Sequence, residues 1–498
     1  MNLSVCIDAT GLTSHATAPL GGGPGAVERV RTFAAGLENA EGVFILVDET
    51  TPEAATSGLR PIRREKWDTV ALVGALKEAA GEADAVLLCR ADTPFLDLDV
   101  TARMLDSHHT YVSEYTFADG YPNGITPEII DPRILDQLRT LAEKAPEPIT
   151  QQALFSIIQK DINAFDVETE LSPVDLRILR ARLVCDTRRD YLLCDRVASE
   201  TDGTAAQITE VLQKKGEILR TLPAYTSIQV VEGEVQLPIY SPYRLMRPDA
   251  LEVREHMAAD QFERLVSELA GFAPDGMLHI SLWGEVGLHP ELPRLISAVE
   301  ATPELGLLVE TSGVGWSEET LREVAAMELE STSFILDLDT DDPDSYRKVR
   351  GEGFQEARRT ADTLLEAHGS RVYVQAVRMQ ETEEQVEKFY RAWKDRGVNV
   401  IVQKYDHYCG RLPDRRVTDI SPVNRFPCRH TQRDLNVLAD GTVVMCREDL
   451  DREHVLGNVF EDGVEATWEN GREKHVRQVR AEYPELCRRC DEYYTFNY

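Results

Sequence analysis

Six short apolar segments alternate with helix-like segments between residues 221 and 415. The apolar segments read TSIQVV, MLHISLWG, LGLLVETSG, TSFILDLD, RVYVQAVR and NVIVQKYD. In the helix-like segment after the first of them, Phe262, Leu265, Val266 and Leu269 recur at the i, i+3, i+4 and i+7 positions of an amphipathic helix. Strands that alternate with helices form parallel sheets, whose ligands bind at the carboxyl ends of the strands. We therefore predict an α/β domain at 221–415, with its sheet open or curled into a partial barrel.

The segments on either side of residues 221–415 differ from that domain and from each other in sequence pattern. Residues 1–125 alternate apolar segments (LSVCID, GVFILVD, DAVLLC, TYVSEY) with helix-like ones, which predicts a second α/β sheet. Residues 126–220 are largely helical and charged in pattern, so we expect a helical appendage there. Residues 416–498 carry most of the clustered cysteines. Four parts are thus predicted: 1–125, 126–220, 221–415 and 416–498.

The charge balance narrows the classes of partner. The formal net charge is −32, which repels phosphate backbones and anionic lipids, so we expect neither nucleic-acid nor membrane binding. No apolar run approaches the roughly 18 to 20 residues that span a bilayer, and the start of the chain lacks a basic segment ahead of an apolar one. We expect a cytoplasmic protein, in which thiols stay reduced.

Four of the nine cysteines lie near the end of the chain in a spacing that suits a metal site. In CRHTQRDLNVLADGTVVMC, which runs from Cys428 to Cys446, the part DLNVLADGTVVM reads as a β-hairpin with Asp-Gly at its turn. The later CRRC supplies Cys487 and Cys490, so four thiolates can converge. Four thiolates suit an iron-sulfur cluster or a zinc ion, and the third alternative is that the four thiols bind no metal. Cys6 and Cys89 sit in apolar segments and are expected to be buried, inert thiols.

The pattern C-x12-G-x4-C, followed by LGNV, by Trp468 and by LCRRCDEYYTFN, resembles the SPASM or twitch domain that follows radical S-adenosylmethionine (SAM) barrels. The resemblance implies an auxiliary cluster in a small C-terminal domain. The cysteines that would bind a second auxiliary cluster are missing. What it implies is therefore one [4Fe-4S] cluster, held by Cys428, Cys446, Cys487 and Cys490.

The 221–415 domain in turn resembles the radical SAM partial (β/α)6 barrel. In that family three cysteines spaced C-x3-C-x2-C hold the cluster that cleaves SAM, but here the spacing falls on Glu234, Pro238 and Ser241. Proline has no side-chain donor, and oxygen ligands are hard, whereas cluster irons need soft thiolates. The resemblance also implies that Gly284 and Glu285 lie near the SAM amino group. We predict that the SAM-cleaving cluster is lost and that bound SAM itself is in doubt.

The first domain resembles the GT-A or Rossmann-like sheet of nucleotidyltransferases. RADTPFLDLD would place Asp92 at the position of a magnesium ligand, and the run PLGGGPGAVERV would place backbone amides near a phosphate. Such enzymes neutralise the triphosphate with basic side chains near this first loop, whereas this chain has no Lys or Arg before Arg29. We predict a structural or docking role for the domain.

The order of the three domain types resembles the spiro-SPASM family over nearly the full length. Our leading interpretation is an iron-sulfur protein with one auxiliary cluster that acts as a binding, scaffold or electron-relay protein toward a peptide or protein. The alternatives are an active radical SAM enzyme that modifies a peptide or protein, a metal-dependent nucleotidyltransferase, and a zinc-stabilised interaction protein.

Overall fold

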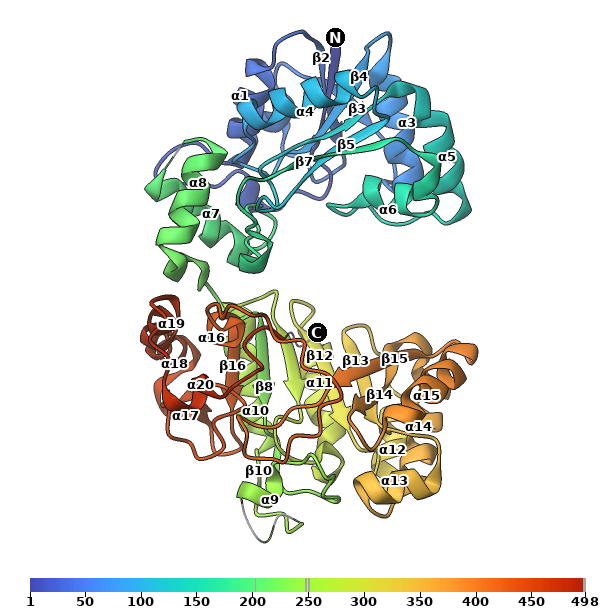
Figure 1. Ribbon diagram of the computed structural model, residues 1–498, viewed down its shortest axis with the longest axis vertical. Coiled ribbons are helices and arrows are strands. Elements are labelled where there is room, and N and C mark those ends of the chain that lie inside the picture. Colours follow the sequence, from blue (N-terminus) through green and yellow to red (C-terminus); the bar gives the residue numbers. More distant parts are fainter. Residues whose placement is uncertain (202, 247–248, 250, 496–498) are drawn as a thin grey trace. The chain divides into compact units, whose positions relative to one another are not determined.

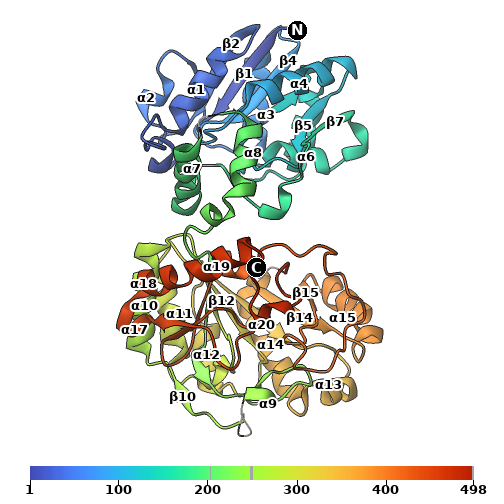
Figure 2. The ribbon, with the colours of Figure 1, turned by 60° about the vertical axis from the view of Figure 1, so that its left-hand side comes forward.

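The computed structural model describes residues 1–201, 203–246, 249 and 251–495. The chain forms two compact units, residues 1–221 and 222–498 (Figures 1 and 2). Each unit is built on one mixed sheet with helices packed against it, so the protein is of the α/β class. Any finer division into four domains stays a prediction.

The first unit contains a seven-stranded sheet in the order β3-β2-β1-β4-β6-β5-β7. β6 runs antiparallel to β4 and β5, and the other neighbours are parallel. The strands are β1 Leu3–Asp8, β2 Ala40–Val47, β3 Arg60–Arg63, β4 Ala85–Arg90, β5 Tyr115–Asp119, β6 Glu128–Ile130 and β7 Val167–Leu171.

Successive side chains of each strand point to opposite faces of this sheet, so both faces carry apolar side chains, and helices cover both. Cys6 and Val86 pack with the residues of α3, α5 and α6 on one face, and Val5 and Leu87 pack with those of α1 on the other. The helices of the unit are α1 Ala26–Gly36, α2 Glu53–Thr56, α3 Thr69–Ala80, α4 Leu98–Thr110, α5 Leu135–Lys144, α6 Ala153–Gln159, α7 Arg188–Glu200 and α8 Ala205–Lys214.

Two predictions for the first unit are wrong in detail. The segment TYVSEY was predicted as a strand, but its first residue ends α4 and the strand β5 starts only at Tyr115. The predicted helical appendage also contributes β6 and β7 to the first sheet. β6 has three residues and β7 reads VETEL, so neither shows the apolar alternation by which strands are recognised.

The second unit contains a nine-stranded sheet in the order β15-β14-β13-β12-β11-β8-β16-β17-β18. All six predicted strands are present, and they pair in parallel with their neighbours as an open, barrel-like sheet. They are β8 Tyr225–Ile228, β11 Met277–Ile280, β12 Gly306–Thr311, β13 Thr332–Asp337, β14 Val372–Arg378 and β15 Asn399–Lys404. A separate pair consists of β9 Val231–Glu232 and β10 Glu255–His256.

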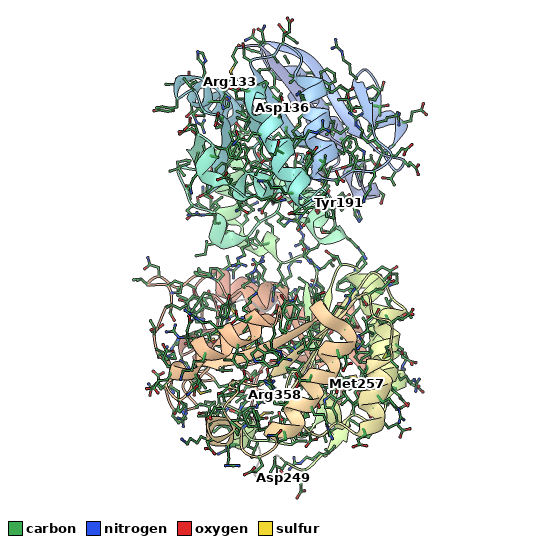
Figure 3. All side chains as sticks on the ribbon, turned by 90° about the vertical axis from the view of Figure 1, so that its right-hand side faces the viewer. Arg133, Asp136, Tyr191, Asp249, Met257 and Arg358 are labelled. Atoms are coloured by element: carbon green, nitrogen blue, oxygen red, sulfur yellow. The ribbon has the colours of Figure 1, made fainter. Side chains whose placement is uncertain are left out.

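Amphipathic helices pack against these strands. Phe262, Leu265, Val266 and Leu269 of α10 are all buried in the main core, as their spacing predicted. Arg358, which is labelled in Figure 3, lies on α14. Its guanidinium is 4.5 Å from the ring centre of Trp393 on α15. The helices are α9 Tyr243–Met246, α10 Ala259–Phe272, α11 Leu292–Glu300, α12 Glu318–Ala325, α13 Pro343–Arg350, α14 Phe354–His368 and α15 Glu383–Asp395.

The predicted cysteine hairpin is confirmed, and it extends the barrel sheet. β16 Asp434–Val437 and β17 Thr442–Val444 pair antiparallel, and Gly441 at the turn has φ +85°, a conformation that glycine adopts without strain. β16 pairs in parallel with β8, so the C-terminal segment and the barrel share one sheet. The remaining elements are β18 Val455–Asn458, α16 Arg429–Arg433, α17 Val459–Asp462, α18 Val464–Asn470, α19 Arg472–Val479 and α20 Glu485–Arg488.

None of the helices in the described part of the chain combines the length and the apolar character that crossing a bilayer requires.

Candidate functional site

A cavity of about 170 Å³ lies at the carboxyl ends of the barrel strands. His279 of β11, Glu310 of β12, Asp337 of β13 and Gln375 of β14 line it, each from a different strand. Glu234, Pro238 and Ser241, the positions with the predicted C-x3-C-x2-C spacing, line the same cavity, as do Gly284 and Glu285. The structure thus brings the predicted barrel residues to one place.

In the loop that carries Glu234, Pro238 and Ser241, the backbone and hydroxyl of Ser241 form hydrogen bonds within the loop. The Ser241 backbone N–H donates to the Pro238 carbonyl (2.9 Å), and the Ser241 hydroxyl accepts from the Tyr243 backbone N–H (3.2 Å) at the start of α9. Burial raises the pKa of Glu234 well above its ordinary value, and the nearby Glu285 adds to this effect. Among the described residues no hydrogen-bond donor reaches the Glu234 carboxylate. The loop therefore presents oxygen atoms and a proline ring to the cavity, and no thiol.

Gly284 and Glu285 support the strand-to-helix turn after β11. Gly284 has φ +143°, and a Cβ atom there would lie 2.0 Å from the Val231 carbonyl oxygen, so only glycine fits. The Glu285 carboxylate accepts from the Gly287 N–H (3.0 Å), from the Ser312 N–H (2.9 Å) and hydroxyl, and from the Thr311 hydroxyl. Both of its oxygens are occupied, so at Gly284 and Glu285 the backbone is left to contact a ligand in the cavity.

Charged groups in the barrel are paired with one another. Arg350 contacts Asp339 (2.9 Å), and His279 contacts Glu310 (2.7 Å). Gln375 donates to both Glu310 and Asp337, and burial together with the charge of Glu310 raises the pKa of Asp337. Two further arginines of this domain are also salt-bridged, since Arg347 pairs with Asp344 and Glu352, and Arg378 pairs with Glu383.

All four predicted cluster cysteines line a second, separate cavity. Cys428 precedes α16, Cys446 follows β17, Cys487 lies in α20, and Cys490 follows two residues after the end of that helix. The first three are buried and Cys490 is half-buried. Burial raises the pKa of the thiols of Cys428, Cys446 and Cys487. Residues 496–498, at the end of the cysteine motif, lie outside the described residues.

The polar groups around the cysteines suit an anionic, sulfur-rich group. Gln478 donates its side-chain amide to the Cys487 sulfur (3.1 Å), and the Glu492 backbone N–H donates to the Cys490 sulfur (3.2 Å). The Asn436 amide nitrogen and two nitrogens of Arg425 are buried without a partner in the described structure, and both residues line the cavity. Buried donors are normally satisfied, so these unused N–H groups favour acceptors such as the sulfur atoms of a cluster.

Two residues near the cysteines were missed at the level of sequence. Cys409, which has no ligand spacing to the other cysteines, lies buried with its thiol beside that of Cys490. Arg447, next to Cys446, lines both the cysteine cavity and the barrel cavity and pairs with Asp406 at 2.8 Å. No spacing rule marks either residue, because both contacts depend on how distant loops pack.

In the first unit the predicted magnesium ligand Asp92 is engaged by an arginine. Arg90 donates to both of its carboxylate oxygens (3.0 and 2.6 Å) and lies 3.5 Å from Asp8. Asp92 is 1% exposed. A metal ion at Asp92 would have to displace this bidentate pair. The position of Asp92 at the end of β4 matches the prediction, but its surroundings favour a structural ion pair.

The glycine run of the first unit packs against a helix. A Cβ atom at Gly21 would lie 2.5 Å from the carbonyl oxygen of Ala198 on α7, and the Gly21 N–H donates to Asp195 (2.9 Å). Arg29 donates to the carbonyls of Leu20 and Pro24 in the same loop. The amide that the resemblance assigned to a phosphate therefore binds a carboxylate, and the first cation of the chain holds the loop.

Glu128 gives the first unit a testable pH dependence. Burial raises its pKa from 4.5 to about 7, although the hydrogen bond from Tyr115 acts in the opposite direction. Because the pKa of Glu128 is higher in the folded state than in the unfolded state, its protonation stabilises the folded state. This stabilisation is complete below about pH 4.5 and is lost as the pH rises to about 7. At 1.36 kcal/mol per pH unit the full loss is about 3 kcal/mol.

We expect Glu128→Gln, which keeps the size of the side chain, to remove this dependence. The midpoint temperature of thermal unfolding of the variant should exceed that of the wild type by several degrees at pH 8, and the difference should shrink toward pH 5. Glu143→Gln, which alters an exposed carboxylate of the same unit, is the control. An equal midpoint for Glu128→Gln and wild type at pH 8 would show that burial of the Glu128 carboxylate does not destabilise the folded protein.

Comparisons with known proteins bear on both units. The SPASM family, an iron-sulfur cluster-binding domain, matches residues 428–491. An uncharacterized protein of Treponema pallidum (strain Nichols) is 34% identical over 358 residues, which cover 69% of this chain and 98% of that protein.

Two solved structures resemble the chain at low identity. Streptococcus suis SuiB bound to the precursor peptide SuiA is 14% identical with a TM-score of 0.43, over 54% of this chain and 70% of SuiB. A cytidylyltransferase from Leptospira borgpetersenii serovar Hardjo-bovis is 16% identical with a TM-score of 0.37, over 44% of this chain and 96% of that enzyme. At such values neither likeness says anything about the activity of this chain.

Proposed function

The chain belongs to the family of the uncharacterized Treponema pallidum protein, and from this premise we propose that it is an iron-sulfur protein with one auxiliary [4Fe-4S] cluster and no SAM-cleaving cluster. The cluster ligands are Cys428, Cys446, Cys487 and Cys490. The observation that carries the proposal is the contrast between two cavities of one unit. Four cysteines line one of them, whereas oxygen atoms and a proline occupy the ligand positions of the other.

In this proposal the barrel cavity is a binding site. Its strand-end polar groups and its position next to the cysteine cavity, with Arg447 in the wall of both, suit a scaffold or an electron relay for a peptide or protein partner. SAM is a second candidate ligand of the cavity, through the backbone at Gly284 and Glu285. We assign the first unit a structural or docking role, because Arg90 occupies the carboxylate of Asp92.

The four-part organisation and the resemblance to the spiro-SPASM family belong to the same proposal. In it, residues 416–498 form the auxiliary cluster domain on the edge of the barrel sheet, where β16 pairs with β8. The alternatives predict different compositions, so chemical analysis separates them.

The test is iron and acid-labile sulfide analysis of the anaerobically reconstituted full-length protein, together with an assay for 5′-deoxyadenosine in the presence of SAM and dithionite. We expect about four irons and four sulfides per chain and no 5′-deoxyadenosine. About eight irons with SAM cleavage would establish an active radical SAM enzyme. A colourless protein with about one zinc would establish a zinc site.

A further inference from the structure

Cys409 lies buried behind two residues that line the cysteine cavity, Cys490 and Glu448. Cys409 is 5% exposed, and its thiol lies within hydrogen-bonding range of the Cys490 thiol. Its sulfur is also 3.9 Å from a carboxylate oxygen of Glu448, and Glu448 lines the cysteine cavity. The chain therefore gathers five thiols at this site, one more than a [4Fe-4S] cluster binds.

The loop that carries Cys409 is held in an uncommon backbone conformation. Tyr408 has φ +48° and Cys409 has φ +56°, so two consecutive non-glycine residues occupy the left-handed region. Such a conformation persists only where the surroundings hold it. Here the Tyr408 N–H donates to the Asp406 carboxylate (2.7 Å), and the Gly410 N–H donates to Nδ1 of His407 (2.8 Å).

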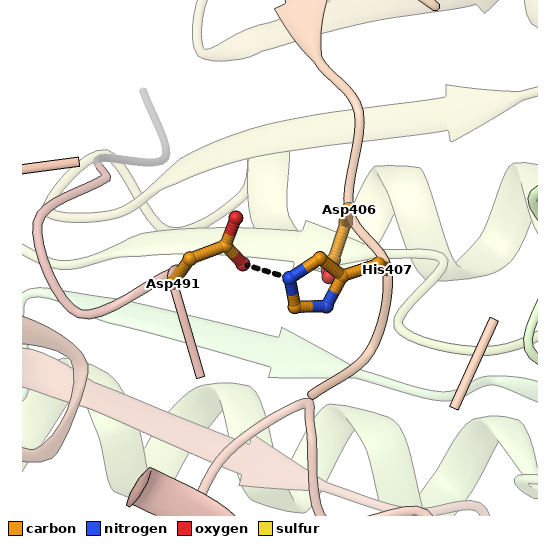
Figure 4. A group of neighbouring side chains, drawn as sticks. All are labelled: Asp406, His407 and Asp491. Atoms are coloured by element: carbon orange, nitrogen blue, oxygen red, sulfur yellow. Dashed lines mark ion pairs between the residues drawn. The ribbon is translucent and has the colours of Figure 1, made fainter. Parts of the chain in front are cut away.

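The same loop is tied to the residue next to Cys490. Figure 4 shows His407 pointing toward Asp491, with Nε2 3.3 Å from a carboxylate oxygen. Lys404, at the end of β15, contacts the other oxygen of Asp491 at 3.0 Å. Because Asp491 directly follows Cys490, these contacts fix the Cys409 loop and the Cys490 segment to each other.

Asp406, His407 and Asp491 come close enough together to suggest a separate metal site, but their hydrogen bonds argue against one. Nδ1 of His407 accepts an N–H, so in the neutral imidazole the proton sits on Nε2, which then has no lone pair for a metal. Arg447 already contacts Asp406, and Lys404 and Arg416 contact Asp491. The group is a clamp between two loops.

We propose that Cys409 is a fifth thiol ligand of the iron-sulfur site, able to replace Cys490 as the fourth ligand. This rests on the proposed function. Cys490 is the replaceable member because it is the least buried of the four and the neighbour of Cys409. In the exchange one iron–sulfur bond to Cys490 breaks and one to Cys409 forms. The proton that leaves the Cys409 thiol is taken up by the released Cys490 thiolate, and no oxidation state changes.

The test compares iron content and the electron paramagnetic resonance spectrum of the reduced protein across alanine variants of the full chain. Alanine is used because serine retains an oxygen donor. We expect Cys487→Ala to lose most of its iron, and Cys490→Ala to keep more than half of the wild-type iron with a shifted spectrum. Cys409→Ala/Cys490→Ala should lose iron as completely as Cys487→Ala. Cys89→Ala, at a buried cysteine of the first unit, controls for the loss of any thiol.

The outcomes divide cleanly. If Cys490→Ala loses as much iron as Cys487→Ala while its circular dichroism spectrum matches that of wild type, Cys409 does not replace Cys490 and the inference fails. If Cys409→Ala loses iron and Cys490→Ala does not, Cys409 is itself the fourth ligand, and the proposed exchange with Cys490 fails. If the wild type itself holds no iron, the proposed function fails first, which is a different result from a failure of the exchange.

Discussion

Replacing Cys428 and Cys446 together by alanine is expected to remove essentially all iron and sulfide from the protein. Both thiols are buried on the wall of the same cavity, and they come from the two ends of the β16–β17 hairpin segment. With both removed, two of the four proposed ligands are lost. Cys487 and Cys490 then leave two irons of the cluster without a thiolate, and one of these stays without a thiolate even where Cys409 can replace one of the lost ligands. We expect the iron content to fall from about four per chain to below a tenth of that.

The measurement is iron and sulfide per chain after identical anaerobic reconstitution, with the absorbance spectrum as a second readout. The matched control is Cys6→Ala/Cys89→Ala, which removes two equally buried thiols from the first unit and should retain all iron. Because metal sites contribute to folding free energy, the unfolding midpoint of the second unit should also fall in the cluster variant. A cluster variant that still binds about four irons would refute the ligand assignment.

Local patterns in the sequence predicted the second unit well, because each of its signals is contained in a short segment. The spacing of Phe262, Leu265, Val266 and Leu269 is a property of one helix, and Asp440-Gly441 is a property of one turn. The four cysteines were found for the same reason, since two short motifs carry them and the hairpin geometry brings the first pair together.

Contacts between distant segments escaped prediction. Cys409 carries no spacing signal, and its place beside Cys490 depends on the two left-handed residues and the His407–Asp491 contact that hold its loop. The guanidinium of Arg90 lies only two residues from Asp92, yet the sequence does not say whether that carboxylate faces a cation of the chain or a bound metal. Strand β7 was missed because VETEL is too polar to resemble a strand, and it is held by contacts with distant residues, its pairing with β5 and the ion pair of Glu170 with Arg103.

Restoring the three cysteines of the barrel, as Glu234→Cys/Pro238→Cys/Ser241→Cys, is expected to raise the iron content from about four to about eight per chain when SAM is present during reconstitution. All three positions line one cavity, and the loop still has the C-x3-C-x2-C spacing. The change replaces a buried carboxylate, a ring without a donor and a hydroxyl by three soft thiolates, which are the ligands that cluster irons require. Ser241→Cys weakens the contact with the Tyr243 N–H, at a cost of about 1 kcal/mol.

The informative control is Glu234→Cys/Ser241→Cys, in which Pro238 stays. Two thiols leave two of the four irons of the site without a protein ligand, one more than SAM can chelate, so this variant should remain at about four irons. A rise to about eight in the triple variant alone would mean that the barrel cavity has kept its shape and lost only its ligands. An unchanged iron content in a folded triple variant would contradict the prediction. It would mean that thiols at these three positions do not suffice for a cluster, because the Tyr240–Arg350–Asp339 contacts hold the loop in an arrangement that a cluster does not fit.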